Sequence, residues 1–338
     1  MSQPSIAVIG AGAIGGITAA YISQAGYHVQ LVCKHQHKAE RFIRQGIHLT
    51  GLRGEHHIQL KAVTDISQLS GQLDIVLIVT KAYDMPDAAR SILPFLKKDS
   101  LVVSMQNGIC VEALAEIVGA NRAVGCVVGW GSTMLEDGTL NMTSEGDFVI
   151  GGIAPDLNLT ELKQVLDSVV PTRITGSIIA ELYSKMIVNA CITSLGVLSG
   201  LYLGQIMKKQ AAREIFISII REAVAVANAM KLTIQPYGGK LDYYALIRGN
   251  SAIDNFRRHL TIRLIGFKYR RLKSSSLQSI RRGKTTEVDY FNGYIAKKGA
   301  EVGVATPVNT RIVEMIKEIE TGIRTIDPLN FRDEKLKN

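Results

Sequence analysis

The chain of 338 residues is 46 % hydrophobic and 20 % charged, with a formal net charge of +9. This length suggests two domains of about 100–200 residues, and the composition excludes a disordered chain, which would combine low hydrophobicity with high net charge. The four cysteines lie far apart without a C-x-x-C pair, which excludes a disulfide scaffold and indicates reduced thiols. The N-terminus has no signal-peptide pattern, and apolar runs such as 74–80 are shorter than the ~20 residues of a bilayer span. We therefore expect a cytoplasmic protein that does not bind a membrane.

Short β-branched runs alternate with helical patterns through the first half of the chain. The runs cover 5–10, 27–33, 74–80, 101–105 and 123–129, and the helical patterns cover 13–25, 84–96 and 109–119. Near-continuous apolar strands separated by helices predict a parallel sheet covered on both faces. The segment 131–153 alternates and contains glycine turns, which predicts an antiparallel hairpin at the sheet edge.

The second half is predicted to be helical. Helical patterns cover 178–198, 209–230, 289–302 and 309–321, and no series of strands returns. Thr306-Pro307 predicts the start of the last helix, because proline suits a first turn. The sequence thus predicts an α/β, doubly wound domain at 1–177 followed by an all-helical domain at 178–338.

A glycine-rich turn joins the first predicted strand to the first predicted helix. It consists of Gly10, Ala11, Gly12, Ala13, Ile14 and Gly15, a G-x-G-x-x-G. In this context the first glycine makes the turn, the second lets a pyrophosphate approach the backbone, and the third packs helix on strand. We interpret the turn as a dinucleotide site of the Rossmann type, with a glycine-rich turn that binds no ligand as the alternative.

The end of the second predicted strand indicates which dinucleotide binds. An NAD site places a carboxylate there, but this strand is followed by Lys34 and further basic residues, with no carboxylate before Glu40. That favours the 2′-phosphate of NADP; the alternative is a set of exposed residues at a helix start. Neither His35-x-His37 nor His56-His57 has further ligands at a suitable spacing, so we predict no metal site.

Further candidates follow other strands and lie on one helix. Lys81 and Asn107 come after predicted strands, where open α/β sheets bind ligands, although such residues are common there. Lys185 and Asn189 are one helical turn apart, and Thr193 extends the same face. A lysine among apolar neighbours either extends to solvent or serves a site.

A basic segment precedes a second candidate, Glu287. Between residues 256 and 286 there is no acidic residue, and the ten basic residues are Arg257, Arg258, Arg263, Lys268, Arg270, Arg271, Lys273, Arg281, Arg282 and Lys284. The segment is either a solvated helix face, a field that attracts a small anionic ligand, or a nucleic-acid surface. Its aromatic residues are too few to indicate base stacking, so we expect no nucleic-acid partner.

Six motifs, in order from residue 5 to about 320, resemble those of the ketopantoate reductases (2-dehydropantoate 2-reductases). They are GAGAIGG, TKAYD at Lys81, QNG at Asn107, KMIVN at Lys185, TEVDYFNG at Glu287 and GVATPVNTR. The resemblance implies an NADP-binding Rossmann domain followed by a helical domain like the C-terminal domain of phosphogluconate dehydrogenase.

The resemblance also implies roles for single residues. Lys185 would be the general acid and Glu287 an essential substrate-binding carboxylate, while Asn189 and Ser275 would contact the substrate. In the cofactor site, Lys34 would bind the 2′-phosphate, and Lys81 and Asn107 would line the pocket. Two positions depart from the family's reference enzymes: Thr193, a candidate substrate contact, replaces an asparagine, and Ser279 replaces an aspartate.

The predicted reaction is the NADPH-dependent reduction of 2-dehydropantoate to pantoate, a step of pantothenate and coenzyme A synthesis. The partner is then a small 2-oxo acid, and a homodimer is compatible with the sequence. One alternative is a paralogous reductase of another 2-oxo acid or an imine. The other is a non-catalytic NADP-binding sensor, which would not need Lys185, Asn189 and Glu287.

Overall fold

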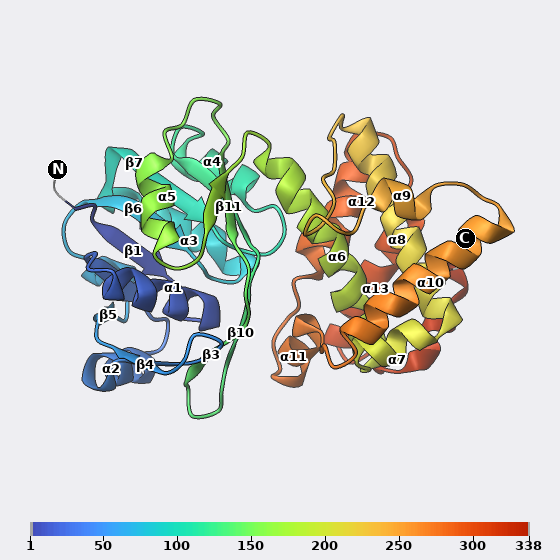
Figure 1. Cartoon of the computed structure of the whole chain (residues 1–338), viewed down its shortest axis with the longest axis horizontal. Helices are drawn as coiled ribbons and strands as arrows, with labels where there is room; N and C mark the ends of the chain where they lie inside the picture. Colours follow the sequence, from blue (N-terminus) through green and yellow to red (C-terminus); the bar gives the residue numbers. More distant parts are fainter. Residues whose placement is uncertain (1–2, 337–338) are drawn as a thin grey trace. The chain divides into compact units, whose positions relative to one another are not determined.

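The structure, a computed structural model, describes residues 3–336. The chain divides into two compact units, Met1–Leu182 and Tyr183–Asn338. The division falls inside the long helix α6 (Ile178–Ser199), whereas the boundary predicted from the sequence lies at the start of that helix. Every named strand of the described residues belongs to the first unit, and the second unit is helical (Figure 1).

The first unit is built on an eight-stranded sheet with the order β12-β11-β8-β7-β6-β1-β2-β5. Neighbouring strands run parallel except for β11, which pairs antiparallel with β8, so the predicted parallel sheet is confirmed. The strands are β1 (Ile6–Ile9), β2 (Val29–Val32), β5 (Lys61–Val63), β6 (Leu73–Ile78), β7 (Leu96–Ser104), β8 (Ala123–Val128), β11 (Phe148–Gly152) and β12 (Thr172–Ile174).

The predicted hairpin belongs to a second, smaller sheet. Its four strands are β4 (His56–Ile58), β3 (Ile47–Gly51), β10 (Leu140–Ser144) and β9 (Gly131–Met134), in that order. β9 and β10 pair antiparallel as expected, but they do not join the main sheet; only β11 does. The buried side of β10 packs on the first helix instead: Leu140 lies so close to it that a Cβ on Gly16 would come within 2.4 Å of Leu140.

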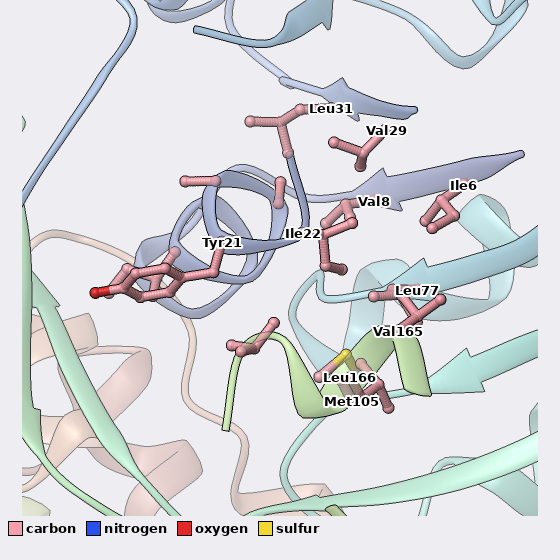
Figure 2. Close-up of a cluster of buried hydrophobic side chains, with 14 of the residues drawn as sticks. Ile6, Val8, Tyr21, Ile22, Val29, Leu31, Leu77, Met105, Val165 and Leu166 are labelled. Carbon is pink, nitrogen blue, oxygen red and sulfur yellow. The ribbon is translucent and has the colours of Figure 1, made fainter. Parts of the chain in front are cut away.

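Helices and side chains from several strands form the core of the first unit. Figure 2 shows Val8, Leu31 and Leu77 from the main sheet gathered with Ile22 of α1 and Val165 of α5, and all five are buried. The helices of this unit are α1 (Ala13–Gln24), α2 (Gln36–Gln45), α3 (Met85–Ser91), α4 (Val111–Val118) and α5 (Thr160–Asp167), with 3₁₀ turns η1 (Ile66–Gln68), η2 (Ala82–Asp84) and η3 (Leu93–Phe95).

The second unit contains the four predicted helices and four that were not predicted. The predicted ones are α6, α8 (Gln210–Ala229), α12 (Asn292–Glu301) and α13 (Pro307–Glu320). The others are α7 (Leu203–Lys208), α9 (Tyr243–Ile247), α10 (Ala252–Lys268) and α11 (Ser275–Arg281), with 3₁₀ turns η4 (Val288–Tyr290), η5 (Pro328–Arg332) and η6 (Glu334–Leu336). Three of the four are short, and α10 lacks the usual polar outer face, so the periodicity missed them.

A chain of buried hydrogen bonds joins four helices of the second unit. Ser194 on α6 donates to the side-chain oxygen of Asn292, whose amide donates to Asn309 on α13 (2.9 Å). The amide of Asn309 donates in turn to Glu222 on α8 (2.6 Å). Glu222 also accepts the backbone N–H groups of Val308 and Asn309, so it caps α13 in place of the Thr306 side chain. Burial raises the pKa of the Glu222 carboxyl above its usual value.

One helix, α6, is long and apolar enough to cross a membrane by length and composition. About two-thirds of it (67 % of its most apolar window) is buried inside the protein, as in the core helix of a soluble protein. Its apolar residues therefore serve packing.

The C-terminal tail is fastened to α13 by an arginine–carboxylate contact. Arg311 donates to the carboxylate of Asp333 from Nε and, at 2.8 Å, from Nη2. Both side chains are only 13–14 % exposed, so solvent screens the contact weakly. The hydrogen bonds from Arg311 hold the pKa of Asp333 below its usual range.

We expect Asp333→Asn to lower the free energy of unfolding by about 1.5–3 kcal/mol at neutral pH, because it removes charge-assisted hydrogen bonds. The folded-state pKa of Asp333 is depressed, so its stabilisation is fully present above the unfolded value near 3.9 and is lost as the pH falls through the folded-state pKa. Urea unfolding in steps from about pH 7 to 3 measures the difference between variant and parent. Asp156→Asn changes an exposed carboxylate and is the control. A difference that stays constant over this range contradicts the assignment.

Candidate functional site

Four predicted cofactor residues or segments lie along one edge of the main sheet. Gly10 follows β1, Lys34 follows β2, Lys81 follows β6 and Asn107 follows β7. These strands are neighbours in the order β7-β6-β1-β2 and run parallel, so their carboxyl ends share an edge (Figure 1). The chain order reverses between β1 and β6, which is the switch point where open α/β sheets bind ligands.

Three glycines shape the turn between β1 and α1, each for a different reason. Gly10 has φ +112°, and a Cβ there would lie 2.9 Å from the backbone of Val79 and Thr80. Gly15 is the contact between helix and strand, because its Cβ would come within 2.0 Å of the carbonyl oxygen of Gly10. At Gly12 a Cβ would meet no protein atom within 4 Å. The turn is closed on the protein side and open at Gly12, as the dinucleotide fingerprint requires.

The N-terminus of α1 fits a phosphate group. Its first turn has neither a side-chain cap nor an acidic residue, so its N–H groups and the positive end of the helix dipole face outward unopposed. Thr80 lies beside Gly10, and its buried hydroxyl has no hydrogen-bond partner among the described residues. These donors fit the pyrophosphate of a dinucleotide, with Gly12 next to it.

Two lysines bring positive charge to this edge. Lys34 is exposed, and its Nζ lies 3.4 Å from the carboxylate of Asp84 in η2. Lys38, in the first turn of α2, donates a hydrogen bond to the carbonyl of Ala11 inside the glycine turn. The sequence prediction named Lys34 only. Lys38 could have been found from its position, one turn into the helix that follows β2.

Lys81 and Asn107 are held at the strand ends in different ways. Lys81 is exposed and is the N-cap residue of η2. Asn107 is half-buried, and the residue before it, Gln106, donates to the carbonyl of Ile78 (2.8 Å) and accepts from Ser104 (2.6 Å). Gln106 thus ties the end of β7 to β6 and positions Asn107.

In the second unit, α6 carries three predicted residues on one face. Lys185 and Asn189 are half-buried and Thr193 is buried. The rotation of α6 near Lys185 is fixed by its neighbours: Tyr183 donates to the carbonyl of Ala223 (2.8 Å), and Ser184 donates to that of Gln235 (2.7 Å). Thr193 donates its own hydroxyl proton to the carbonyl of Asn189 (2.7 Å), so this bond stays within the helix.

The start of α11 lies against α6 next to Thr193. Ser274, the N-cap residue, donates to the carbonyl of Thr193 (2.9 Å) and accepts the N–H of Leu277. The two segments touch at Gly196, where a Cβ would come within 2.3 Å of Ser274. Ser275 is therefore placed beside the α6 face, and it is exposed.

Glu287 is a buried carboxylate, only 5 % exposed, on the segment before η4. The N–H of Thr286 is held by Glu320 of α13 (2.6 Å), and the hydroxyl of Thr286 accepts the N–H of Val288 (3.2 Å). Five residues after Glu287, Asn292 accepts the bond from Ser194 of α6. The structure thus ties the Ser275 and Glu287 segments to the same helix that carries Lys185 and Asn189.

The basic segment has mixed roles. Arg257 donates to the carbonyl of Ala245 (2.9 Å), and Arg258 is buried and donates to the carbonyl of Gly249. These two arginines hold the loop after α9. The remaining basic residues of the segment are exposed, apart from the half-buried Lys273.

The described residues offer one group of possible metal ligands and no reactive thiol. The carboxylate oxygen Oε1 of Glu55 lies 2.8 Å from Nε2 of His48 and 3.9 Å from Nε2 of His57. The two histidine rings stack on each other across β3 and β4. His48 and His57 lie on the small sheet and Glu55 directly precedes β4; the sequence spacing did not indicate that His48 and Glu55 are neighbours of His57. All four cysteines are buried, and burial raises the pKa of Cys33 to about 11, which excludes it as a thiolate nucleophile.

Comparisons with known proteins agree with this layout. Residues 6–155 match the family described as "Ketopantoate reductase PanE/ApbA", and residues 177–320 match "Ketopantoate reductase PanE/ApbA C terminal". The chain belongs to the ketopantoate reductase family, whose members are nicotinamide-dependent reductases. The two matches cover both units in chain order, which confirms the resemblance that the six motifs indicated.

Individual relatives are distant but span the whole chain. The 2-dehydropantoate 2-reductase of Aquifex aeolicus is 26 % identical over 93 % of this chain and 96 % of its own length. A ketopantoate reductase structure from Ralstonia eutropha JMP134 has a TM-score of 0.81 at 24 % identity, covering 94 % of this chain and 99 % of that one. D-mandelate dehydrogenase, solved with NADH and anilino(oxo)acetate, has a TM-score of 0.79 at 22 % identity, with coverages of 94 % and 99 %. These two structures share the fold.

The glycine turn gives a matched pair of tests. Gly12→Ala should leave the melting temperature of the protein alone within about 1–2 °C, because the new methyl group meets no protein atom, but should weaken dinucleotide binding at least about tenfold. Gly15→Ala should destabilise the fold by about 1–3 kcal/mol, because its methyl group collides with the Gly10 carbonyl. Thermal unfolding and NADPH fluorescence titration separate the two effects. Unchanged NADPH binding by Gly12→Ala contradicts the placement of the pyrophosphate.

Proposed function

We propose that this protein is an NADPH-dependent 2-dehydropantoate 2-reductase. The proposal rests on the combination of two features in one chain. The glycine turn is open at Gly12, and Lys185 and Asn189 lie one turn apart on a fixed face of α6. A binding module would need the glycine turn alone. Family membership and the curated relatives support a reductase of this kind.

The charge at the end of β2 supports NADP as the cofactor. Lys34 stands where an NAD site would have a carboxylate, and Lys38 adds a second ammonium group at the glycine turn. A 2′-phosphate bound there would compete with Asp84 for Lys34, which is an exposed and therefore weak ion pair. When bound, NADPH supplies the hydride.

The chain itself supplies charge stabilisation and a proton. The ammonium group of Lys185 donates to the carbonyl oxygen of the 2-oxo acid, where negative charge develops as the hydride arrives. Lys185 then transfers its proton to that oxygen and yields the 2-hydroxy acid. Asn189, one turn along α6, donates from its amide and keeps the oxygen in line with Lys185. The anchors on Tyr183 and Ser184 hold this face in place before substrate binds.

Two further polar residues, Glu287 and Ser275, bind different groups of the substrate. Glu287 is a buried acceptor suited to a substrate hydroxyl, since a carboxylate repels the carboxylate of the substrate itself. Ser275 is exposed beside the α6 face and is suited to hydrogen-bond that substrate carboxylate. A site that pairs the hydroxyl in this way favours substrates that carry it, because an analogue without the hydroxyl forfeits a charge-assisted hydrogen bond.

A second candidate is a paralogous reductase of a different, bulkier 2-oxo acid. Two short hydroxyl side chains favour this candidate. Thr193 donates to the backbone carbonyl of Asn189, and Ser279 donates to the backbone carbonyl of Ser275 (3.2 Å), so each hydroxyl bonds within its own helix. D-mandelate dehydrogenase, solved with NADH and anilino(oxo)acetate, has the same fold, which supports including an aromatic 2-oxo acid in the test.

The direct test is NADPH oxidation with a panel of ketopantoate, 2-oxoisovalerate, benzoylformate and pyruvate. We expect ketopantoate to be reduced with a kcat/KM at least about tenfold above that for 2-oxoisovalerate, which lacks the hydroxyl. In Glu287→Gln this preference should shrink, while the rate with 2-oxoisovalerate changes little. A preference for benzoylformate assigns the protein to the paralogous class, and no turnover of any member contradicts the reductase assignment.

Two lysine variants should separate cofactor binding from chemistry. Lys34→Ala should raise the KM for NADPH about 10–150-fold and leave that for NADH nearly unchanged, since it removes one charge-assisted phosphate contact of about 1.5–3 kcal/mol. Lys185→Ala should lower kcat by about 10²–10⁴-fold and leave NADPH affinity intact. Each variant is the control for the other. Equal affinity of the parent protein for NADPH and NADH contradicts the choice of NADP, and a rate within a few-fold of the parent in Lys185→Ala contradicts its role as the acid.

A further inference from the structure

Two histidines face each other across neighbouring strands of the small sheet. His48 on β3 and His57 on β4 are paired in the antiparallel register of these strands (Figure 1), and the centroids of their rings lie 4.2 Å apart. Side chains paired in this way lie on the same face of a sheet. His56, one residue earlier, points the other way, and its ring meets Tyr21 of α1. The strand alternation thus separates two adjacent histidines and pairs one of them with a histidine of the next strand.

A carboxylate completes the group. Glu55 stands two positions before His57, and side chains two positions apart in an extended chain point to the same face. Its Oε1 atom lies 2.8 Å from Nε2 of His48 and 3.9 Å from Nε2 of His57. The three candidate ligand atoms all lie within 4.8 Å of one another. A surface ion pair accounts for His48 and Glu55, but it does not account for a second histidine beside the same oxygen.

The separations between these atoms fit a small divalent cation. Zinc binds histidine nitrogen and carboxylate oxygen at about 2.0–2.2 Å, so two ligand atoms of a tetrahedral site stand about 3.3–3.6 Å apart. The observed 2.8 Å and 3.9 Å lie on either side of that range. The side chains of Glu55 and His57 are 68 % and 63 % exposed, so both can rotate to close on an ion.

The ring of His48 is held through its other nitrogen. β10 pairs with β3 on the side away from β4, and Thr139 directly precedes β10. The hydroxyl of Thr139 lies 3.2 Å from Nδ1 of His48. A hydroxyl can donate or accept, so this contact persists when Nε2 of the histidine exchanges a proton for a metal ion. Metal-binding histidines usually have such a partner on the second nitrogen, because it fixes the orientation of the ring.

The turn that carries Thr139 is itself fixed. Arg41 of α2 donates to the backbone carbonyls of Asp137 (2.8 Å) and Gly138 (3.1 Å). The carboxylate of Asp137 accepts the N–H of Thr139 (2.8 Å). Thr139 is therefore in place before an ion binds, which lowers the entropic cost of forming the site.

We propose that His48, Glu55 and His57 form a zinc-binding site on the small sheet, with water as the fourth ligand. Two imidazoles and one carboxylate suit zinc better than Ca²⁺ or Mg²⁺, which prefer oxygen ligands alone. The bound ion joins β3 to β4 and braces that end of the small sheet. The proposal is independent of the proposed reduction, because none of its ligands is assigned to the cofactor or the substrate. Sequence spacing alone predicted no metal site, since His48 comes from the neighbouring strand.

Isothermal titration of zinc chloride into the metal-free, untagged protein tests the site. We expect one ion per chain with a Kd below about 50 µM. His57→Ala and Glu55→Gln should each weaken binding at least about tenfold, because each removes a ligand. Both variants change exposed side chains, so the far-UV circular dichroism spectrum should stay that of the parent.

His37→Ala is the matched control. His37 is exposed and its ring stacks on that of His35, so it belongs to another histidine pair that could attract a metal ion. We expect this variant to bind zinc like the parent. A parent Kd weaker than about 50 µM overturns the proposal. It is also overturned if His37→Ala loses the binding, or if both His57→Ala and Glu55→Gln keep it.

Cobalt(II) reports the geometry of the ligands directly. Tetrahedral Co²⁺ absorbs visible light far more strongly than the octahedral aquo ion, and zinc should displace it because zinc binds the same ligands more tightly. The parent protein with cobalt chloride should show the strong bands, and added zinc should remove them. His57→Ala should show only the weak absorption of the aquo ion. Weak absorption in the parent, or strong bands that persist in His57→Ala, contradicts a site built from these three residues.

Discussion

The buried hydrogen-bond chain from Ser194 to Glu222 is the constraint on which the second unit depends. Each member of the chain is buried, so each must keep its partner or lose about 1–3 kcal/mol for an unsatisfied group. The chain joins α6, α12, α13 and α8, and it therefore fixes the register of the helix that carries Lys185 and Asn189 against the segment that carries Glu287. The candidate site of this unit is a consequence of that register.

In the first unit, the topology of the sheet positions the candidate residues. Its parallel strands bring Asn107, Lys81, the glycine turn and Lys34 to one edge without any long polar network. Close packing at Gly15 brings α1 against β1, and the exposed Gly12 leaves its N-terminus accessible. Backbone N–H groups at a fixed turn can bind a phosphate at no cost in side-chain entropy.

Much of both units follows from local patterns. The alternation of strands and helices, the glycine turn and the i, i+4 pair Lys185 and Asn189 obey short-range rules of backbone geometry, and the structure keeps all of them. The six motifs identified the family for the same reason, since each is a short local run of residues and all six occur in the family's order along the chain. The prediction was wrong where an element's partner lay far along the chain, as for the hairpin of β9 and β10: β10 pairs with β3, and the hairpin does not join the edge of the main sheet.

The sequence by itself determined the two types of domain, the position of the dinucleotide turn and the residue types of the site. The tertiary structure alone decided that Glu222 caps α13, that Lys38 reaches Ala11, and that α10 turns its apolar face outward. These features depend on contacts between residues 27 to 86 positions apart, or on which face of a helix finds a partner. Local periodicity specifies that a helix has an apolar face, but only packing against the rest of the chain determines whether that face is buried.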